Sequence, residues 1–111
     1  IIDGPQNFKR DFISIDDVCY LLDKICFNGK SRLYNVASGR NTSNRQMGEF
    51  ICRYTNSKLV FKNTSENYYK NKKIYIKKIK KEFKYSPKTI KDNIRNIINK
   101  DSNYEINKKP R

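Results

Sequence analysis

The chain has 111 residues, with 25 Lys or Arg and 11 Asp or Glu, giving a formal net charge of +14. A length of roughly 100–200 residues suits one domain or part of one. The absence of histidine excludes a His-based triad and a His-ligated metal. No apolar run approaches the ~20 residues that cross a bilayer, and no signal peptide is evident. The first residue is Ile, so we expect a processed product or a piece of a longer protein.

The positive charge is concentrated in the second half of the chain. Residues 1–57 carry a net charge of +2 and residues 58–111 a net charge of +12. Clustered lysines are the usual electrostatic footprint of nucleic-acid binding. The competing interpretation is compositional, because Lys, Asn, Ile and Tyr are all abundant and have A/T-rich codons. Both interpretations stay open on charge alone.

Three cysteines, Cys19, Cys26 and Cys52, form neither a C-x-x-C pair nor a dense disulfide pattern. Free cysteine commonly behaves as a small buried hydrophobe. The sequence therefore predicts three reduced cysteines in or near the core of a cytoplasmic protein, without a metal site.

Strand-like and helix-like patterns alternate along the first half of the chain. A short apolar run predicts a strand over residues 12–15, and Asp16 and Asp17 suit the first turn of a following helix. Helical spacing continues to Asn28-Gly29, where glycine marks the end. The apolar face of this predicted helix contains Val18, Leu21, Leu22, Ile25 and Cys26.

Residues 33–37 predict a second strand, which stops at Ser38-Gly39. Ser43 and Gln46 match a capping box and open a second helix. Residues 58–62 predict a third strand, and residues 63–73 a polar loop. Ile76, Ile79 and Phe83 lie on one face of a Lys-rich third helix.

The last predicted helix begins after Ser86-Pro87, where Thr89 and Asp92 match another capping box. It continues to about residue 99, and we expect the polar tail over 101–111 to be disordered. The predicted order is therefore β-α-β-α-β-α-α, an α/β lobe with parallel strand pairing. Residues 1–100 form this lobe. Its three short strands would make a small sheet, which is more typical of one part of a larger protein than of an independent domain.

Three stretches in register resemble one protein family. Residues 4–18 read GPQNFKRDFISIDDV, residues 34–39 read YNVASG before Thr42-Ser43, and residues 79–87 read IKKEFKYSP. They are similar to elements of the NAD-dependent nucleotide-sugar epimerases and dehydratases, the extended short-chain dehydrogenases/reductases. The resemblance covers residues 4–99 and implies the C-terminal, substrate-side part of this Rossmann-type fold.

The resemblance implies an enzyme of nucleotide-sugar or surface-polysaccharide metabolism, such as one acting on a UDP-sugar. The complete protein would remove a hydride from the sugar to NAD, held by an N-terminal Rossmann domain. This chain has neither the Gly-rich NAD motif nor a credible catalytic Tyr-x-x-x-Lys pair. Tyr and Lys are so abundant that several Tyr-x-x-x-Lys spacings are expected by chance. We therefore expect no catalytic, cofactor or metal residue here, and no turnover by the chain alone.

Two residues are candidates for substrate binding. The family resemblance implies that Arg10 contacts the diphosphate of the nucleotide-sugar, which suits the paired donors of a guanidinium. The alternative is a salt bridge from Arg10 to Asp11, Asp16 or Asp17. Phe12 occupies the aromatic position beside that arginine, and its alternative role is a core-facing strand residue.

The sequence also departs from the family pattern. Residues 63–75 lack the family's second phosphate-binding Arg, whose place nearby lysines could take, and Lys84 replaces a glycine where left-handed backbone is expected. Two rival hypotheses remain: a small basic module that binds nucleic acid through residues 70–84, and an inactive remnant. The sequence has no nucleic-acid-binding signature and no membrane segment. We therefore expect no membrane partner, and no nucleic-acid binding beyond non-specific attraction by the positive charge.

Overall fold

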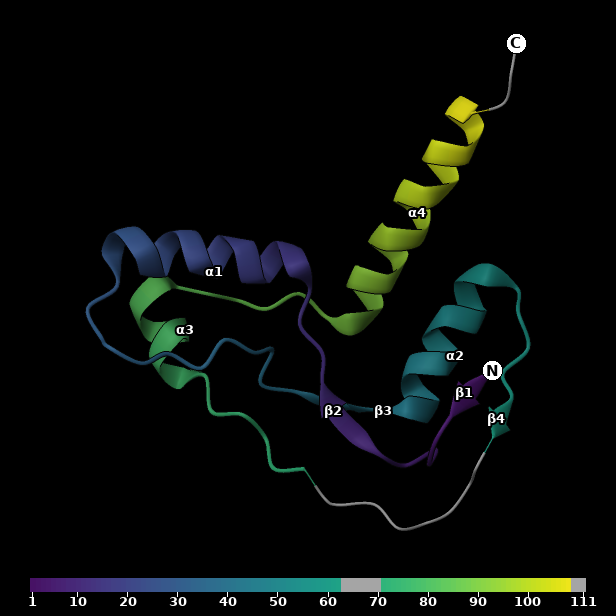
Figure 1. The fold of residues 1–111 in the computed structure, drawn as a ribbon, viewed down its shortest axis with the longest axis horizontal. Coiled ribbons are helices and arrows are strands. Elements are labelled where there is room, and N and C mark those ends of the chain that lie inside the picture. The colour runs from purple at the N-terminus through teal and green to yellow at the C-terminus, as the bar shows by residue number, and fades with distance from the viewer. Residues whose placement is uncertain (63–70, 109–111) are drawn as a thin grey trace.

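The computed structural model describes residues 1–62 and 71–108, with side chains to residue 101 (Figure 1). The polar loop expected over residues 63–73 therefore lies mostly outside the described residues, as do residues 109–111. The elements in chain order are β1 (Ile2–Asp3), β2 (Lys9–Asp11), α1 (Ile15–Asn28), β3 (Asn41–Ser43), α2 (Asn44–Thr55), β4 (Phe61–Lys62), α3 (Lys77–Phe83) and α4 (Ile90–Lys108).

The mixed α/β architecture and all four helices are confirmed. Ser43 and Gln46 form the predicted capping box at the start of α2. Thr89 accepts a hydrogen bond from the backbone of Asp92 at 3.2 Å and so caps α4. The sequence did not identify Ser14 as the cap of α1, where its hydroxyl accepts from the Asp17 backbone. α4 continues to Lys108, beyond residue 100, at which the sequence predicts the end of the ordered lobe.

The first predicted strand is wrong in position. The run at residues 12–15 is not a strand: β2 precedes it, and Ile15 already belongs to α1. β2 pairs antiparallel with β3, which the sequence did not predict, in the register Lys9 to Ser43 and Asp11 to Asn41. Both strands are polar and therefore lack the apolar alternation that identifies a half-buried strand.

Residues 33–37, the second predicted strand, have no strand partner in the part of the chain that the structure describes. Side chains hold this segment instead. Asn35 donates to the backbone oxygen of Tyr75 at 3.0 Å, and the Lys78 ammonium donates to the Leu33 carbonyl at 3.0 Å. A strand requires a neighbouring chain, so β propensity alone did not produce one.

The third predicted strand is present only as β4, which pairs with β1 in parallel. Gly48 of α2 packs beneath this pair, and a β-carbon there would lie 2.9 Å from the Ile2 side chain. α4 also contacts α2. This end of the molecule is therefore separate from the main core, with the β2–β3 ladder between them (Figure 1).

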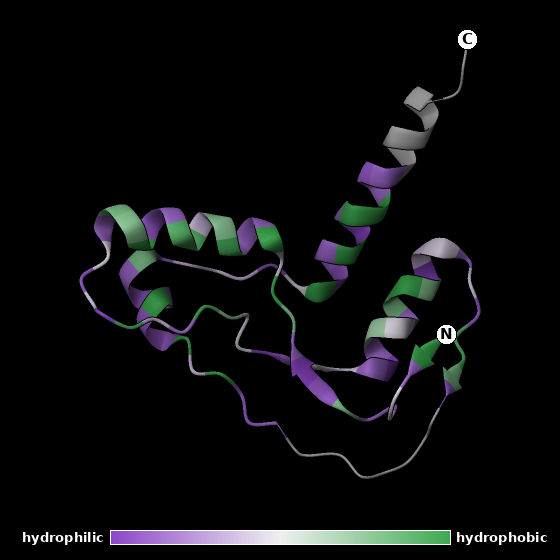
Figure 2. Ribbon diagram, in the orientation of Figure 1, coloured by the Kyte–Doolittle hydropathy of each residue, from purple (hydrophilic) through white to green (hydrophobic). Residues whose placement is uncertain are grey.

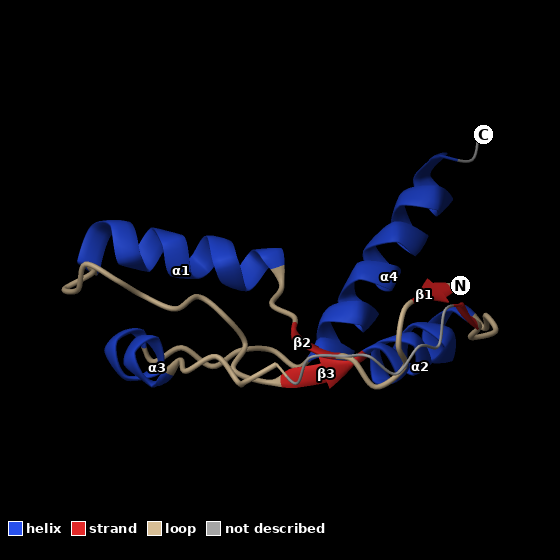
Figure 3. Cartoon of the chain, turned by 60° about the horizontal axis from the view of Figure 1, so that its bottom comes forward, coloured by secondary structure: helices blue, strands red, loops and turns tan. Residues whose placement is uncertain are grey.

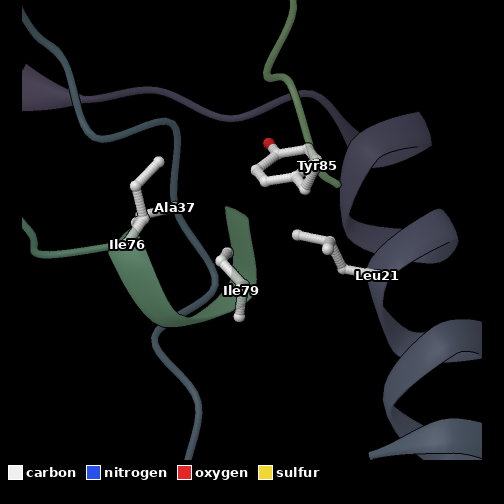
Figure 4. Packing of buried hydrophobic residues seen from close by; sticks show 5 residues of the cluster. All are labelled: Leu21, Ala37, Ile76, Ile79 and Tyr85. Carbon is white, nitrogen blue, oxygen red and sulfur yellow. The ribbon is translucent and has the colours of Figure 1, made fainter. Parts of the chain in front are cut away.

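The main core lies between α1, α3 and the chain on either side of α3 (Figure 4). Leu21 and Ile79 are completely buried, and the ring of Tyr85 packs with them. Partly buried side chains surround this centre, among them Ile13, Ile25, Tyr34, Val36 and Phe83. Among the described residues, the buried centre of this core is small and consists of Leu21, Ala37, Ile76, Ile79 and Tyr85.

The chain is flat and extended for its length. Its extents are 50 × 46 × 16 Å and its radius of gyration is 17.1 Å, against about 13 Å for a compact domain of this size. Its accessible surface is 9077 Å², about 2,600 Å² more than a compact monomer of this mass would expose. The far end of α4 stands away from the rest in two views (Figures 1 and 3).

The outward side of α1 carries much of the exposed apolar surface. Ile15 is 72% exposed and Leu22 50% exposed, although Leu22 was predicted to face the core. Cys19 and Cys26 are also exposed and lie on the same outward stripe, so the prediction that they are core residues is wrong. Cys52 is half-buried. The residues of this stripe, Ile15, Cys19, Leu22 and Cys26, are four, three and four positions apart. This helical spacing is typical of a face that packs against another element.

Glu82 ties α3 to the chain that follows α1. Its carboxylate accepts from the Tyr34 hydroxyl at 2.7 Å and from the Lys30 backbone at 2.9 Å. These hydrogen bonds, led by the one from Tyr34, lower the pKa of Glu82 below its usual value. The interaction helps to fix the relative positions of α1 and α3.

Lys84 has the left-handed conformation that the sequence predicted, with φ 51° and ψ 33°. We expect Lys84→Gly to stabilise the chain by about 0.5–1 kcal/mol, because relief of left-handed strain exceeds the entropy that glycine adds to the unfolded chain. Urea unfolding of the two proteins measures the difference. Asn56→Gly is the matched control, since Asn56 also has a left-handed backbone (φ 54°) but tolerates it better. A larger gain at Asn56 would contradict the argument.

Candidate functional site

The β2–β3 ladder holds the candidate site. Its strands read Lys-Arg-Asp and Asn-Thr-Ser, and β2 is hydrophilic throughout (Figure 2). Arg10 lies at the middle of β2, opposite Thr42. Its guanidinium lies 4.8 Å from the centre of the Phe8 ring, two residues earlier on the same face. The ladder therefore fixes the backbone of Arg10, while the side chain remains exposed.

The three acids that could have neutralised Arg10 have other partners. The carboxylate of Asp11 accepts from two backbone amides, and that of Asp16 pairs with Lys100 at 3.8 Å. The carboxylate of Asp17, which is buried, accepts from the Lys88 backbone at 3.3 Å. Among the described residues, no ion pair of Arg10 is present. Asp16 and Asp17 lie in the first turn of α1, as predicted.

Asp11 is the organising residue of this site. One carboxylate oxygen accepts from the Ser38 backbone N–H at 2.8 Å, and the other from the Arg40 backbone N–H at 3.1 Å. The Ser38 hydroxyl also accepts from the Arg40 backbone N–H, at 3.1 Å. Charge-assisted bonds of this kind are stronger than neutral ones. The carboxylate therefore locks the turn at residues 38–40 against the end of β2.

Gly39, within this turn, requires its glycine. Its φ is +71°, and a β-carbon there would lie 2.8 Å from two atoms of the Ile76 side chain. Phe12, the second candidate substrate residue, directly follows β2 and is half-buried. Its position next to Asp11 places it beside the turn, and its role as a ligand contact stays a prediction.

The chain that follows the undescribed segment runs beside the ladder. Asn41 donates to the Asn71 carbonyl at 3.0 Å, and Asn71 donates to the Lys9 carbonyl at 2.9 Å. These two bonds attach residue 71 to both strands. The backbone of Lys72 and Lys73, which follow Asn71, therefore starts near the ladder, and both side chains are exposed.

Tyr85 belongs to the main core, where its ring packs with Leu21 and Ile79, and it is 4% exposed. Burial, together with the negative charges of Asp17 and Asp11, raises the pKa of Tyr85 to about 12. Although Asp17 is close enough to oppose ionisation, the Tyr85 hydroxyl makes no hydrogen bond of acceptable geometry to the described residues. Tyr85 is therefore a core ring with an unsatisfied hydroxyl.

We expect Tyr85→Phe to change the pH dependence of stability at alkaline pH. The folded-state pKa of about 12 lies above the ordinary value near 10, so the unfolded chain loses this proton first. Wild-type stability should therefore fall relative to Tyr85→Phe as the pH rises from about 10 through 12. At pH 8 the stability of Tyr85→Phe should equal or slightly exceed that of the wild type, because a buried hydroxyl without a hydrogen bond costs free energy that phenylalanine avoids.

Urea unfolding at pH 8 and pH 11 measures this difference. Tyr75→Phe, at an exposed ring, controls for the loss of a hydroxyl elsewhere. Parallel behaviour of wild type and Tyr85→Phe at both pH values would show that the hydroxyl ionises equally in the two states.

The Tyr-x-x-x-Lys spacings do not form a described acid–base pair. In Tyr20/Lys24, the ammonium lies over the tyrosine ring, 5.5 Å from its centre, rather than beside the hydroxyl. Tyr54/Lys58 spans the end of α2, with Lys58 exposed. The pairs Tyr68/Lys72, Tyr69/Lys73 and Tyr104/Lys108 include side chains outside the described residues.

The sequence missed two residues of this site. Asp11 was considered only as a partner of Arg10, and Arg40 was not considered. No local pattern identifies either role, because the bonds of Asp11 join residues 27 and 29 positions apart. The available signal was a carboxylate at a strand end and a Ser-Gly turn whose amides need acceptors.

Comparison with solved structures identifies the fold. RMD from Pseudomonas aeruginosa, complexed with NADPH, is similar with a TM-score of 0.70 and 20% identity, over 88% of this chain and 34% of that chain. The dTDP-glucose 4,6-dehydratase from Bacillus anthracis, in complex with NAD, is similar with a TM-score of 0.63 and 20% identity, over 85% and 32%. This chain shares their fold.

The likeness confirms the expected fold, because the second of these proteins is by name a sugar-nucleotide dehydratase. The chain spans about a third of the length of each structure. Neither the scan against protein-family models nor the search of curated proteins gives a match. Within the described residues, no helix combines the length and apolar character needed to span a membrane.

Proposed function

We propose that this chain is the nucleotide-sugar-binding lobe of an NAD-dependent epimerase or dehydratase, and that Arg10 contacts the substrate diphosphate. The observation that carries the proposal is an exposed arginine fixed on a short ladder, with the neighbouring carboxylates engaged elsewhere. A guanidinium without an acidic partner is suited to binding phosphate. The three sequence elements and the shared fold support the same assignment.

The lobe would work together with a separate NAD-binding domain. The excess accessible surface supports this, since a standard protein–protein interface buries about 1,600 Å² in total. The outward stripe of α1 and the exposed side chain of Leu33 offer apolar surface to such a domain. The complete enzyme would act on cytoplasmic nucleotide-sugars, as in surface-polysaccharide synthesis.

Calorimetric titration with UDP tests the binding role. We expect Arg10→Gln to weaken UDP binding by about tenfold or more, because a hydrogen bond to a charged group contributes about 1.5–3 kcal/mol. Arg53→Gln, on the exposed end of α2, removes the same charge elsewhere and is the matched control. An equal loss of UDP affinity in the two variants would show that the binding is only non-specific attraction by the net charge of +14.

The chain alone should not turn over a nucleotide-sugar. Mixing it with a UDP-sugar and NAD is expected to give no epimerised or dehydrated product. Measurable turnover would contradict the assignment of catalysis to a separate domain.

A further inference from the structure

A second arginine lies next to the ladder that carries Arg10. In an antiparallel pair, directly opposed residues share a face, and side chains two residues apart along a strand share it too. Arg10 is opposite Thr42. Arg40 directly precedes β3 and lies two residues before Thr42, so a continuation of the strand alternation to this residue would put it on the face of Arg10.

The backbone of Arg40 is held at this position by the same carboxylate that follows Arg10. Its N–H donates to Asp11 at 3.1 Å and to the Ser38 hydroxyl at 3.1 Å, and its carbonyl accepts from that hydroxyl at 3.2 Å. The residue is exposed, and no ion pair of its guanidinium occurs among the residues that the structure describes. Asp11 therefore fixes the turn that carries Arg40 without neutralising its side chain.

We propose that Arg40 is the second anion contact of this site, and that Arg10 and Arg40 together bind the two phosphoryl groups of a nucleoside diphosphate. Diagonal neighbours on one face of a ladder lie about 7–8 Å apart, within reach of two arginine side chains. Two planar guanidinium groups can each hold one phosphoryl group in paired hydrogen bonds. The inference rests on the proposed function, which supplies the class of ligand.

This assignment differs from the expectation that lysines replace the missing second arginine of the family. Lys72 and Lys73 are near the ladder through Asn71, but their ammonium groups are exposed and make no described contact with it. Lysine is also a point charge on a flexible stem, whereas Arg40 begins from a fixed backbone. The two assignments predict different variants to be sensitive.

Titration of the chain with UDP and with UMP separates the two phosphoryl contacts. We expect Arg40→Gln to weaken UDP binding by about tenfold while changing UMP binding by less than about twofold, because UMP lacks the second phosphoryl group. Arg40→Lys should retain part of the affinity, since charge remains but paired donors are lost. Arg53→Gln controls for net charge, and circular dichroism confirms that each variant keeps its helices.

The outcomes distinguish this inference from the proposed function. Loss of UDP affinity in Arg10→Gln with none in Arg40→Gln overturns the role of Arg40 and leaves the proposed function standing. Loss in a Lys72→Gln, Lys73→Gln double variant but not in Arg40→Gln assigns the second contact to the lysines instead. If the wild-type chain does not bind UDP at all, the proposed function fails and the inference with it.

Discussion

Replacing Asp11 with alanine is expected to cost the chain about 3 kcal/mol of its unfolding free energy. The carboxylate accepts from the backbone amides of Ser38 and Arg40, and Ser38 is 7% exposed. Each hydrogen bond to a charged group contributes about 1.5–3 kcal/mol, and removing the acceptor leaves a buried amide unsatisfied. The estimate is below the sum of two bonds because the Arg40 amide also has the Ser38 hydroxyl.

Urea unfolding measures this cost, with Asp23→Ala on the exposed side of α1 as the matched control for losing one negative charge. Asp11→Asn should be intermediate, because one amide oxygen can still accept one of the two bonds. UDP binding should also fall in Asp11→Ala, since the turn carrying Arg40 is released. Equal stability of Asp11→Ala and Asp23→Ala would show that the turn does not depend on the carboxylate.

Gly39→Ala is expected to destabilise the chain by about 2–3 kcal/mol, for two separable reasons. Left-handed backbone costs a non-glycine residue about 1–2 kcal/mol, and the φ of Gly39 is +71°. Forcing extra atoms into a packed region costs a further ~1–3 kcal/mol. The new β-carbon would lie 2.8 Å from the Ile76 side chain, which is buried in the core.

A double-mutant cycle separates the two costs. In an Ile76→Ala background the steric clash is removed, so Gly39→Ala should cost only about 1 kcal/mol, the backbone contribution. Gly4→Ala is the matched control, because its φ is +127° but a β-carbon there has no neighbour closer than 3.7 Å. An unchanged cost in the Ile76→Ala background would contradict the proposed clash.

The helices, and the starts of α2 and α4, could be predicted because they depend on residues close in sequence. The Ser43/Gln46 and Thr89/Asp92 pairs each span three positions, and both cap a helix in the structure. The left-handed backbone at Lys84 was expected from the family resemblance, because the family has a glycine at this position. These features are decided within about one helical turn, so the local sequence contains the necessary information.

The strands could not be predicted to the same extent, because a strand exists only where a second segment pairs with it. Residues 33–37 have β-favouring side chains but no described partner. Lys9–Asp11 has no apolar alternation and is nevertheless a strand, since Asn41–Ser43 lies beside it. Likewise, the apolar side chains of α1 are divided between two sides, and Leu21 is buried while Leu22 is half exposed.

The sequence by itself determined the α/β class, the order of the helices, the capping residues of α2 and α4, and the choice of Arg10 as a candidate binding residue. It determined these through local hydrogen bonding, helical periodicity and a resemblance of short motifs. Only the tertiary structure decided that Asp11 binds the turn at residues 38–40 rather than Arg10, and that this turn brings the backbone of Arg40 to the end of β2. Those relations join residues about thirty positions apart, and their geometry comes from strand register and packing, which a linear pattern does not specify.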